Sequence, residues 1–400
     1  MASPESKSPE QSEKNRKYDR QLRLWGDHGQ ATLEAAHVCL INATGLGTEI
    51  LKSLVLPGIG AFTIVDGKKI TVEDIEPNFF LEADSVGKSR AQVATEILLE
   101  LNPDVTGDYI DEEPEQILSN SPDFFNSFTV VVATALTEKT LVLLSKRLWE
   151  LDIPLIVCRS IGFIAYMRIQ IKEHTVIETH PDNETPDLRL DRPFDSLKKH
   201  LDSINLNEMS FKDHCHVPYL IILYKYLEKW ILEHRALPKL YKDKQQLRDM
   251  IKSGIRRDEH DSSNSEENFE EAMKAVNTFQ NLETPESMMI YYVMLRGVDK
   301  FQAEYNSYPG EFDDQVEPDI VKLKTCLTKL LSEWGCGPLA KDDYVHEFCR
   351  FGGAELHSVS AFLGGLAAQE TIKLITNQYK PVHNTFIYDA VTSNSGTFFF

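Results

Sequence analysis

The sequence predicts an α/β protein whose first part is a Rossmann-like, doubly wound and mostly parallel sheet. Short, nearly continuous apolar runs alternate with helically spaced segments, which is typical of strands buried on both faces between covering helices. The clearest unit is the apolar run "HVCLINA", the helical "TEILKSLVLPG" and the apolar run "AFTIVD", together residues 37–66. A strand, a helix and a second strand in this order predict a βαβ unit with parallel strands.

The same alternation continues after residue 66. "GKSRAQVATEILLELNP" is predicted as a helix, "FTVVVATA" as a strand, residues 138–150 as a helix, and "PLIVCRS" as a strand. "GFIAYMRIQIKEHTVIE" then alternates apolar and polar residues, which indicates an antiparallel strand or hairpin added to the sheet. These segments place the first part of the Rossmann-like domain at residues 16–180. The polar residues 1–15 before it are predicted to form a disordered tail.

Helical spacing dominates the remaining sequence. Residues 181–300 are predicted to form a helical insert, in which the charged run "RRDEHDSSNSEEN" indicates a flexible acidic loop at residues 256–267. Residues 301–400 are predicted to return to the first domain with further helices. The end of the chain, "NTFIYDAVTSNSGTFFF", indicates two short strands separated by a turn at "SNSG".

Composition excludes several classes of partner. The chain has 62 acidic and 42 basic side chains and a formal net charge of -20, so it should repel a nucleic-acid backbone. No apolar run approaches the ~18 residues that a membrane span requires, and the polar N-terminus has no signal core. The six cysteines form no CxxC pair, which favours free thiols in a reducing compartment. We therefore expect a cytoplasmic or nuclear protein that binds neither nucleic acid nor membrane.

The loop after the first predicted strand is an incomplete phosphate-binding motif. A dinucleotide fold requires G-x-G-x-x-G at this place. With Gly47 as the third glycine, Asn42 and Thr44 stand at the first two positions; with Gly45 and Gly47 as the first two, an isoleucine stands at the third. Asp66 does end the second strand, where an acidic residue would bind a ribose hydroxyl. The motif alone leaves open whether the pocket is idle or binds a nucleotide weakly.

A wider set of motifs carries a resemblance to a known family. "KYDRQLRLWG" at residues 17–26, followed by "GLGTEILKSLVLPGIGAFTIVD", resembles the activating enzymes of ubiquitin and ubiquitin-like modifiers. "PNFFL", "ITNQ" and the segment from "KDDYVHEFCRFGGAELHS" to "IKLIT" are similar to the regulatory, non-catalytic subunits of the neddylation-activating enzymes. The resemblance implies a ThiF/MoeB-like adenylation fold and a heterodimer. In such dimers a silent half accompanies a catalytic subunit that adenylates the modifier and takes it as a thioester.

The resemblance also implies that this chain is the silent half. Active members carry an Asn and an Arg near the phosphates, and the matching run "EDIEPNF" has Glu76 and Pro77 there. Arg90 stands in the place of the family's catalytic lysine, and "VVVATALTEK" lacks the expected magnesium-binding Asp. We therefore expect no metal and no cofactor in this chain, with ATP and Mg bound by the catalytic partner, and Asn42, Thr44, Gly45, Gly47 and Asp66 as remnants of a site.

Four residues are predicted to face the partner. Arg20 matches an arginine that, in the family, reaches from the silent half into the partner's ATP site, although a solvated helix arginine would look the same. Trp25 could anchor the interface or pack inside the chain. Gly364 and Gly365 fit either a docking helix or a plain core helix. "DHCHVP", with His214, Cys215 and His216, is interpreted as loop packing rather than a metal or thiol site.

The chain is shorter than the regulatory subunits that it resembles, and the gap falls near "NTFQNLETPESMMIYY", so the helical insert is predicted to be reduced. The leading interpretation is a regulatory subunit that supports adenylation and thioester formation of a ubiquitin-like modifier. Two alternatives are a free-standing adenylating or NAD-linked Rossmann enzyme, and a truncated interaction protein that binds without activating. The identity of the modifier rests on the resemblance alone.

Overall fold

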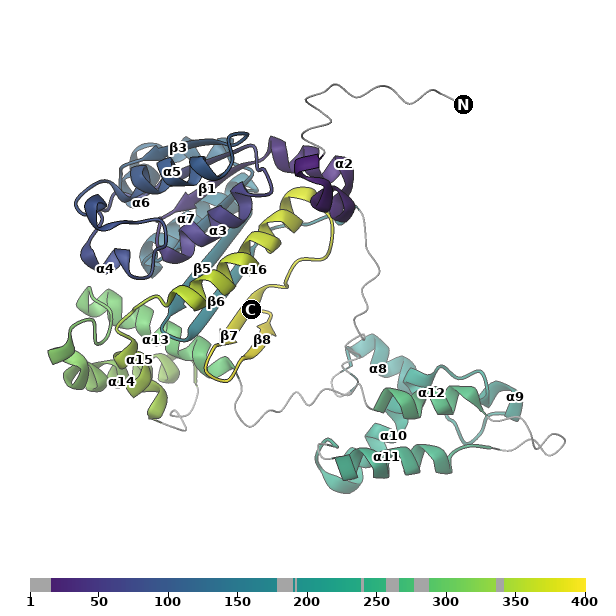
Figure 1. Ribbon diagram of the computed structural model, residues 1–400. Coiled ribbons are helices and arrows are strands. Elements are labelled where there is room, and N and C mark those ends of the chain that lie inside the picture. The colour runs from purple at the N-terminus through teal and green to yellow at the C-terminus, as the bar shows by residue number, and fades with distance from the viewer. Residues whose placement is uncertain are drawn as a thin grey trace, which may run out of the picture. The chain divides into compact units, whose positions relative to one another are not determined.

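The computed structural model describes residues 16–177, 190, 193–238, 241–256, 266–276, 288–335 and 342–400. The chain forms two compact units (Figure 1). The first, here called the sheet unit, comprises Met1–His180 and Met288–Phe400, and the second, the helical insert, comprises Pro181–Ser287. Each unit is described by itself. The predicted tail at residues 1–15 and most of the predicted loop at 256–267 lie outside the described residues.

The sheet unit confirms the predicted α/β fold. Eight strands, counted over the described residues, form one sheet in the order β3-β2-β1-β4-β5-β6-β7-β8. The pairs from β3 to β5 are parallel, and those from β5 to β8 are antiparallel. The strands are β1 (His37–Ile41), β2 (Ala61–Val65), β3 (Thr106–Ile110), β4 (Val130–Thr134), β5 (Leu155–Ile161), β6 (Ile164–Gln170), β7 (Thr385–Asp389) and β8 (Asn394–Phe398).

Helices cover both faces of this sheet because its central strands are apolar on both faces. Along β1, Val38 and Leu40 join one buried cluster, whereas Cys39 and Ile41 join another, as the two-residue period of a strand requires. The first cluster includes residues of α3, α5 and α16, and α16 runs alongside α3 (Figure 1). The second includes residues of α7. The helices of the first part are α2 (Asp19–Ala35), α3 (Gly45–Val55), α4 (Val72–Ile75), η1 (Ala83–Ser85), α5 (Arg90–Leu101), α6 (Pro114–Asn120), η2 (Pro122–Ser127) and α7 (Glu138–Leu151).

The C-terminal part of the sheet unit contributes α13 (Met289–Tyr305), η4 (Asp313–Gln315), α14 (Val316–Glu333), α15 (Asp343–Phe351) and α16 (His357–Thr376). The sheet unit resumes at residue 288, so α13 lies outside the insert, which we had predicted to extend to residue 300. The reason is its apolar face, since Leu295, Val298 and Phe301 pack against α14. A Cβ on Gly297 would lie 2.4 Å from Leu327 Cδ2, so the two helices approach closely there.

Two local features differ from the sequence pattern. β3 was not predicted, because this edge strand is largely exposed and carries no apolar run. The turn between β7 and β8 lies at residues 390–393 rather than at "SNSG", whose last three residues belong to β8. Asp389 sets this turn by accepting hydrogen bonds from the Val391 amide (2.9 Å) and the Thr392 hydroxyl (2.7 Å).

The helical insert contains α8 (Asp195–Asp202), α9 (Phe211–His214), α10 (Tyr219–His234), α11 (Tyr241–Ser253) and α12 (Glu267–Ala275). These helices share their own apolar core, whose largest members include Trp230 and Phe269. In the part of the chain that the structure describes, no helix is both long and apolar enough to cross a membrane.

Candidate functional site: a closed nucleotide loop

The loop from β1 to α3 adopts the tight turn of a phosphate-binding loop. Asn42 has a left-handed backbone (φ 64°), and the Thr44 side chain caps α3 by accepting a hydrogen bond from Gly47 N at 3.3 Å. A Cβ on Gly47 would lie 2.6 Å from the Asn42 carbonyl oxygen, so this position requires glycine. The fold thus brings together the five predicted remnants, Asn42, Thr44, Gly45, Gly47 and, at the end of β2, Asp66.

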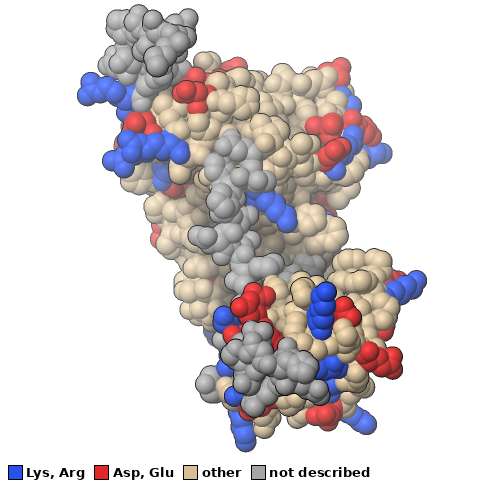
Figure 2. Space-filling model, turned by 90° about the vertical axis from the view of Figure 1, so that its right-hand side faces the viewer, with Lys and Arg blue, Asp and Glu red and all other residues tan. Residues whose placement is uncertain are grey.

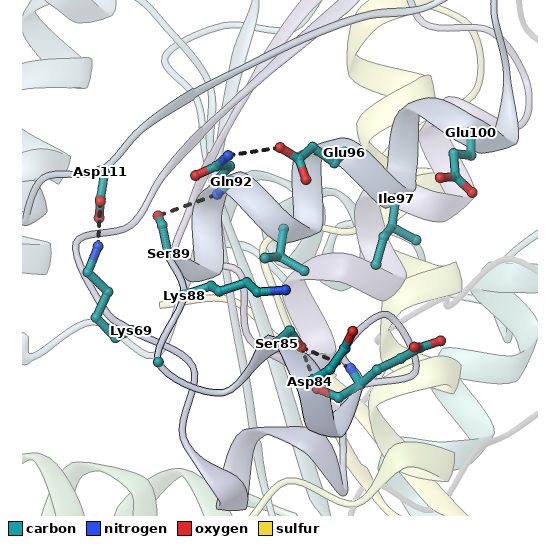
Figure 3. A pocket seen from close by; sticks show the side chains of 13 residues that line it. Lys69, Asp84, Ser85, Lys88, Ser89, Gln92, Glu96, Ile97, Glu100 and Asp111 are labelled. Carbon is teal, nitrogen blue, oxygen red and sulfur yellow. Dashed lines mark hydrogen bonds and ion pairs between the residues drawn. The ribbon is translucent and has the colours of Figure 1, made fainter.

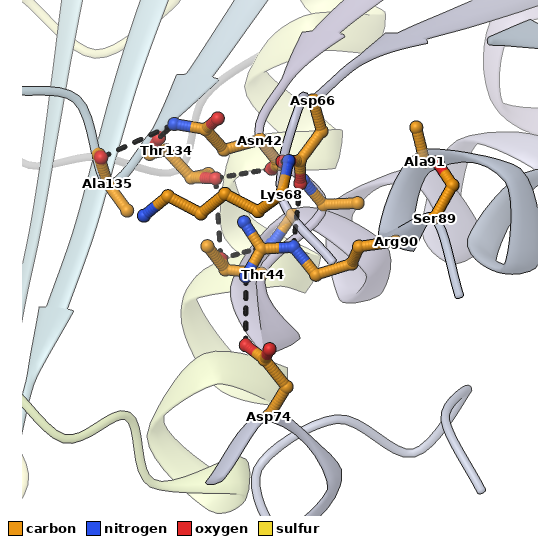
Figure 4. Close-up of polar contacts among 12 residues, drawn as sticks. Asn42, Thr44, Asp66, Lys68, Asp74, Ser89, Arg90, Ala91, Thr134 and Ala135 are labelled. Carbon is orange, nitrogen blue, oxygen red and sulfur yellow. Dashed lines mark hydrogen bonds and ion pairs between the residues drawn. The ribbon is translucent and has the colours of Figure 1, made fainter. Parts of the chain in front are cut away.

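Asp66 is fully buried, and both of its carboxylate oxygens accept hydrogen bonds from this chain (Figure 4). Its Oδ2 accepts hydrogen bonds from Ala43 N (2.8 Å) and Arg90 Nε (2.7 Å), and its Oδ1 accepts one from Lys68 N (3.0 Å). A ribose hydroxyl would need an exposed acceptor on this carboxylate. Asp66 therefore holds the loop together instead of presenting itself to a ligand.

Arg90 lies between two carboxylates (Figure 4). Besides the bond to Asp66, its Nη1 donates to Asp74 Oδ1 at 2.8 Å, and only 5% of the side chain is exposed. Burial works against the charge, but Asp66 and Asp74 outweigh it and raise the pKa of the Arg90 guanidinium. The cation that stands in the place of a catalytic lysine is thus committed to two internal ion pairs.

The N-terminus of α3, where a phosphate would bind, holds a carboxylate from elsewhere in the chain. Leu46 N donates to Glu355 Oε2 at 3.0 Å, across 309 residues of sequence. Burial raises the pKa of Glu355, against the opposing effects of the Leu46 amide and the Thr44 side chain. Sequence reasoning missed Glu355, and the only signal is an acid directly after two glycines and an alanine, which has no spacing rule that connects it to α3.

The segment that carries Glu76 and Pro77 also packs against the loop between β1 and α3. A Cβ on Gly45 would lie 2.6 Å from the Pro77 carbonyl oxygen, so the two backbones are in close contact. Asn78, which is buried, accepts a hydrogen bond from the Thr48 hydroxyl (3.1 Å) and one from Phe80 N (3.0 Å). Little room therefore remains beside the first turn of α3.

The end of β4 offers no carboxylate for magnesium. Thr134 donates its hydroxyl proton to the Asn42 carbonyl (2.7 Å) and accepts a bond from Asn42 Nδ2 on its own carbonyl (2.9 Å). The first acid after β4 is Glu138, which pairs with Arg296 at 2.5 Å. Within the described ranges, no three His, Cys, Asp or Glu side chains are grouped to hold a metal ion. The chemistry of this donor set does not fit a magnesium–nucleotide complex.

Arg20 lies on the exposed surface of α2, away from these contacts. Among the described residues, no hydrogen bond or ion pair is formed by its side chain, whereas Arg23 pairs with Asp19 at 3.0 Å and Lys17 with Asp104 at 2.7 Å. The helix is kinked at Gly26, whose φ is 67°. In Figure 2, acidic and basic side chains lie mixed in small groups on the face in view. Arg20 is thus an exposed basic side chain that no described acidic residue neutralises.

The three remaining interface candidates differ in what they touch. Trp25 is 7% exposed, and its Nε1 donates to Gln30 Oε1 at 3.1 Å inside this chain. A Cβ on Gly364 would lie 2.8 Å from Glu49 Cβ, so this glycine lets α16 approach α3. A Cβ on Gly365 would meet no atom of a described residue within 4 Å. Of the three, Gly365 faces open space, and a role at an interface stays a prediction.

"DHCHVP" packs in the helical insert. His214 is buried and its Nδ1 lies 2.7 Å from Glu266 Oε1, while the Cys215 thiol donates to the same oxygen at 3.4 Å. Glu266 Oε2 also accepts a bond from Arg256 N at 2.8 Å. His214 is thus part of a structural hydrogen-bond network centred on Glu266.

A separate pocket of about 480 Å³ lies between the outer side of α5 and the preceding loop (Figure 3). It includes none of the five remnants of the nucleotide loop. Its lining carries five acids, Glu82, Asp84, Glu96, Glu100 and Asp111, and two lysines, Lys69 and Lys88. Lys69 is paired with Asp111 at 2.6 Å. Because acids outnumber lysines, the net charge of the lining is negative and opposes the binding of phosphate.

Comparison with known proteins gives one consistent family. The ThiF family matches residues 18–399. The NEDD8-activating enzyme E1 regulatory subunit of Xenopus laevis is 41% identical over 524 residues, with 96% of this chain and 98% of that protein covered. The protein of that name in Drosophila melanogaster is 38% identical, with 99% of each chain covered. Among solved structures, Escherichia coli MccB with MccA-N7isoASN is 12% identical, with a TM-score of 0.46 over 96% of this chain and 71% of that chain.

The alignments also bear on length. The alignment with the Xenopus protein runs over 524 residues, whereas this chain has 400. Parts of that relative therefore have no counterpart here.

Proposed function

The chain belongs to the ThiF family and, within it, to the NEDD8-activating enzyme E1 regulatory subunits, and from this membership we propose that it serves as the non-catalytic subunit of a heterodimeric modifier-activating enzyme. Its partner would be the catalytic subunit, which adenylates NEDD8 or a similar ubiquitin-like modifier and takes it as a thioester. The observation that carries the proposal is the closed nucleotide loop in a chain of this family. A member whose ribose and phosphate positions are filled by its own Arg90 and Glu355 is suited to support a reaction elsewhere.

We further propose that this chain binds no ATP or magnesium and that both are bound by the partner. Support comes from the groups described above, since the Asp66 and Glu138 carboxylates and the Leu46 amide are all engaged within the chain. An adenylating or NAD-linked enzyme would need at least the ribose acceptor and the helix N-terminus free. The free-standing enzyme is therefore the weaker reading of this fold.

Arg20 is the residue that we propose to act on the reaction. An arginine supplied in trans can stabilise the charge that develops on phosphates during nucleotidyl transfer. Support comes from its exposure and from the lack of an ion pair with any described residue. The Arg20 guanidinium would enter the partner's ATP site and contact the phosphates there.

One experiment tests the proposal. Modifier-dependent exchange of labelled pyrophosphate into ATP is measured with the catalytic subunit alone and with this chain added. We expect exchange to require the chain. If the two subunits bind each other and exchange stays absent, the chain is an interaction protein without activating function, an alternative that its short length relative to the Xenopus protein supports.

A further inference from the structure

The first turn of α3 has its amide groups satisfied in a specific way. A helix begins with N–H groups that have no partner within the helix, and together with the helix dipole they attract anions. Gly47 N donates to the Thr44 hydroxyl at 3.3 Å and Thr48 N to the Thr44 carbonyl at 3.0 Å. Leu46 N donates to Glu355, so the group that satisfies it is a carboxylate from another part of the chain.

The position of Glu355 is fixed by its own loop, between α15 and α16. Gly352 and Gly353 have left-handed backbones (φ 55° and 74°), which turn the chain sharply after α15. Gly162 N then donates to the Ala354 carbonyl at 2.7 Å, and Gly162 forms an isolated parallel bridge with Glu355. The loop is thereby fixed to the end of β5, and Glu355 reaches α3 from a defined place.

The Glu355 carboxylate can approach the loop before α3 because residue 45 is a glycine. A Cβ at residue 45 would lie 3.1 Å from Glu355 Oε2, a contact tighter than usual, and Gly45 has none. The glycine that would let a phosphate approach the backbone therefore lets the carboxylate approach instead.

We propose that Glu355 is an internal substitute for a nucleotide phosphate: its carboxylate occupies the anion position at the N-terminus of α3 and keeps the loop closed without a ligand. The inference deepens the proposed function, because it explains how a silent half keeps a phosphate loop folded with no nucleotide. On this proposal the anion position at the N-terminus of α3 is still present and is covered by Glu355. Removing the carboxylate should then expose Leu46 N to a small oxyanion from solution.

The test is thermal unfolding of the full chain in a titration of inorganic phosphate, with chloride at matched ionic strength as reference. Glu355→Ala removes the carboxylate. Glu347→Ala is the matched control, because Glu347 lies on α15 and its one ion pair with a described residue, Arg350 at 2.9 Å, is exposed. We expect phosphate to raise the melting temperature of the E355A variant by a saturable shift, as binding to the folded state does. The wild type and E347A should show only the small, shared, non-saturating effect of the salt.

Two results would overturn the proposal: an equal saturable shift in the wild type, which would mean that the anion position is already open, or no saturable shift in E355A. If E355A does not fold, Glu355→Gln is measured in its place, since the amide keeps the volume and one acceptor but not the charge. Phosphate should then compete with this neutral cap for the anion position, and an E355Q response equal to that of the wild type would overturn the proposal. Pyrophosphate exchange by the heterodimer is scored separately, so the failure of either proposal is recognisable.

Discussion

Arg90 donates its Nε proton to Asp66 Oδ2 at 2.7 Å, and both side chains are buried, the carboxylate completely. This pair joins the end of β2 to the start of α5 at the place where a nucleotide-binding member of the fold would expose its acidic residue. In this chain the Asp66 carboxylate therefore stabilises the loop through internal contacts and is not exposed to bind a ribose hydroxyl.

Loss of the Arg90 guanidinium should destabilise the chain strongly. Arg90→Ala leaves Asp66 buried beside Asp74 without a cation, and breaking a buried ion pair in this way costs about 3–5 kcal/mol of unfolding free energy. Urea unfolding measures the change. The control is Arg147→Ala, whose ion pair with Asp123 is largely exposed and should contribute about 1 kcal/mol or less. Equal losses in the two variants would contradict the structural role of Arg90.

The isolated chain should not bind magnesium–ATP. The ribose acceptor Asp66 is covered by Arg90, and Leu46 N at the phosphate position is occupied by Glu355. Isothermal titration calorimetry is expected to give no binding heat above dilution, with the catalytic subunit as the positive control. Tight, magnesium-dependent binding by this chain alone would show that the loop opens for a nucleotide.

Arg20→Ala should slow adenylation by the partner without weakening the fold. The side chain is exposed and unpaired among the described residues, so its loss should leave the melting temperature unchanged. Removing a donor that stabilises developing charge slows such reactions on the order of 100-fold. Arg23→Ala is the matched control, because Arg23 lies on the same helix but pairs with Asp19. The readout is pyrophosphate exchange by the heterodimer; similar rates for both variants and the wild type would exclude the role in trans.

Glu355 should make stability depend on pH in a defined direction. Burial raises its pKa above the ordinary value of 4.5, with the Leu46 amide, Thr44 and Arg90 opposing the rise and Asp74 adding to it. A carboxyl whose pKa is higher in the folded state stabilises that state when protonated, and this stability is lost as pH rises through the folded pKa. Relative to Glu355→Gln, the wild type should therefore gain unfolding free energy as pH falls from neutral towards 4.5. Urea unfolding of both proteins at each pH measures the difference, and a flat or opposite trend would refute it.

Glu266 should control the stability of the helical insert alone. It is buried and accepts hydrogen bonds from Cys215 and Arg256 N, and it pairs with His214. Glu266→Ala leaves the buried His214 and the partly buried Cys215 and Arg256 N without this partner, which we expect to destabilise the insert by about 3 kcal/mol. Hydrogen exchange should accelerate in α10 and α12 and stay unchanged in the sheet. Glu267→Ala, at the adjacent exposed position, should have little effect, and faster exchange in the sheet would contradict two separate cores.

Much of the fold followed from sequence pattern, because the strands β1, β2, β4 and β5 are short apolar runs, which are typical of a sheet covered on both faces. β3 escaped the pattern since its side chains are mostly exposed. The remnants of the nucleotide loop were found because the dinucleotide-binding motif fixes their spacing along the chain. Glu355 was not, since its contact with Leu46 is made only by the folded chain. The sequence also could not separate Gly364, which contacts α3, from Gly365, which faces open space.

The helical insert leaves the sheet unit after β6 and returns before α13, and its apolar side chains pack on one another. Such a segment has an apolar core of its own, distinct from the clusters that cover the strands. A change in chain length within the insert therefore bears on a core that Arg90 and Glu355 do not belong to. Members of the family can therefore differ in length in this part while they share the strands and the helices that cover them.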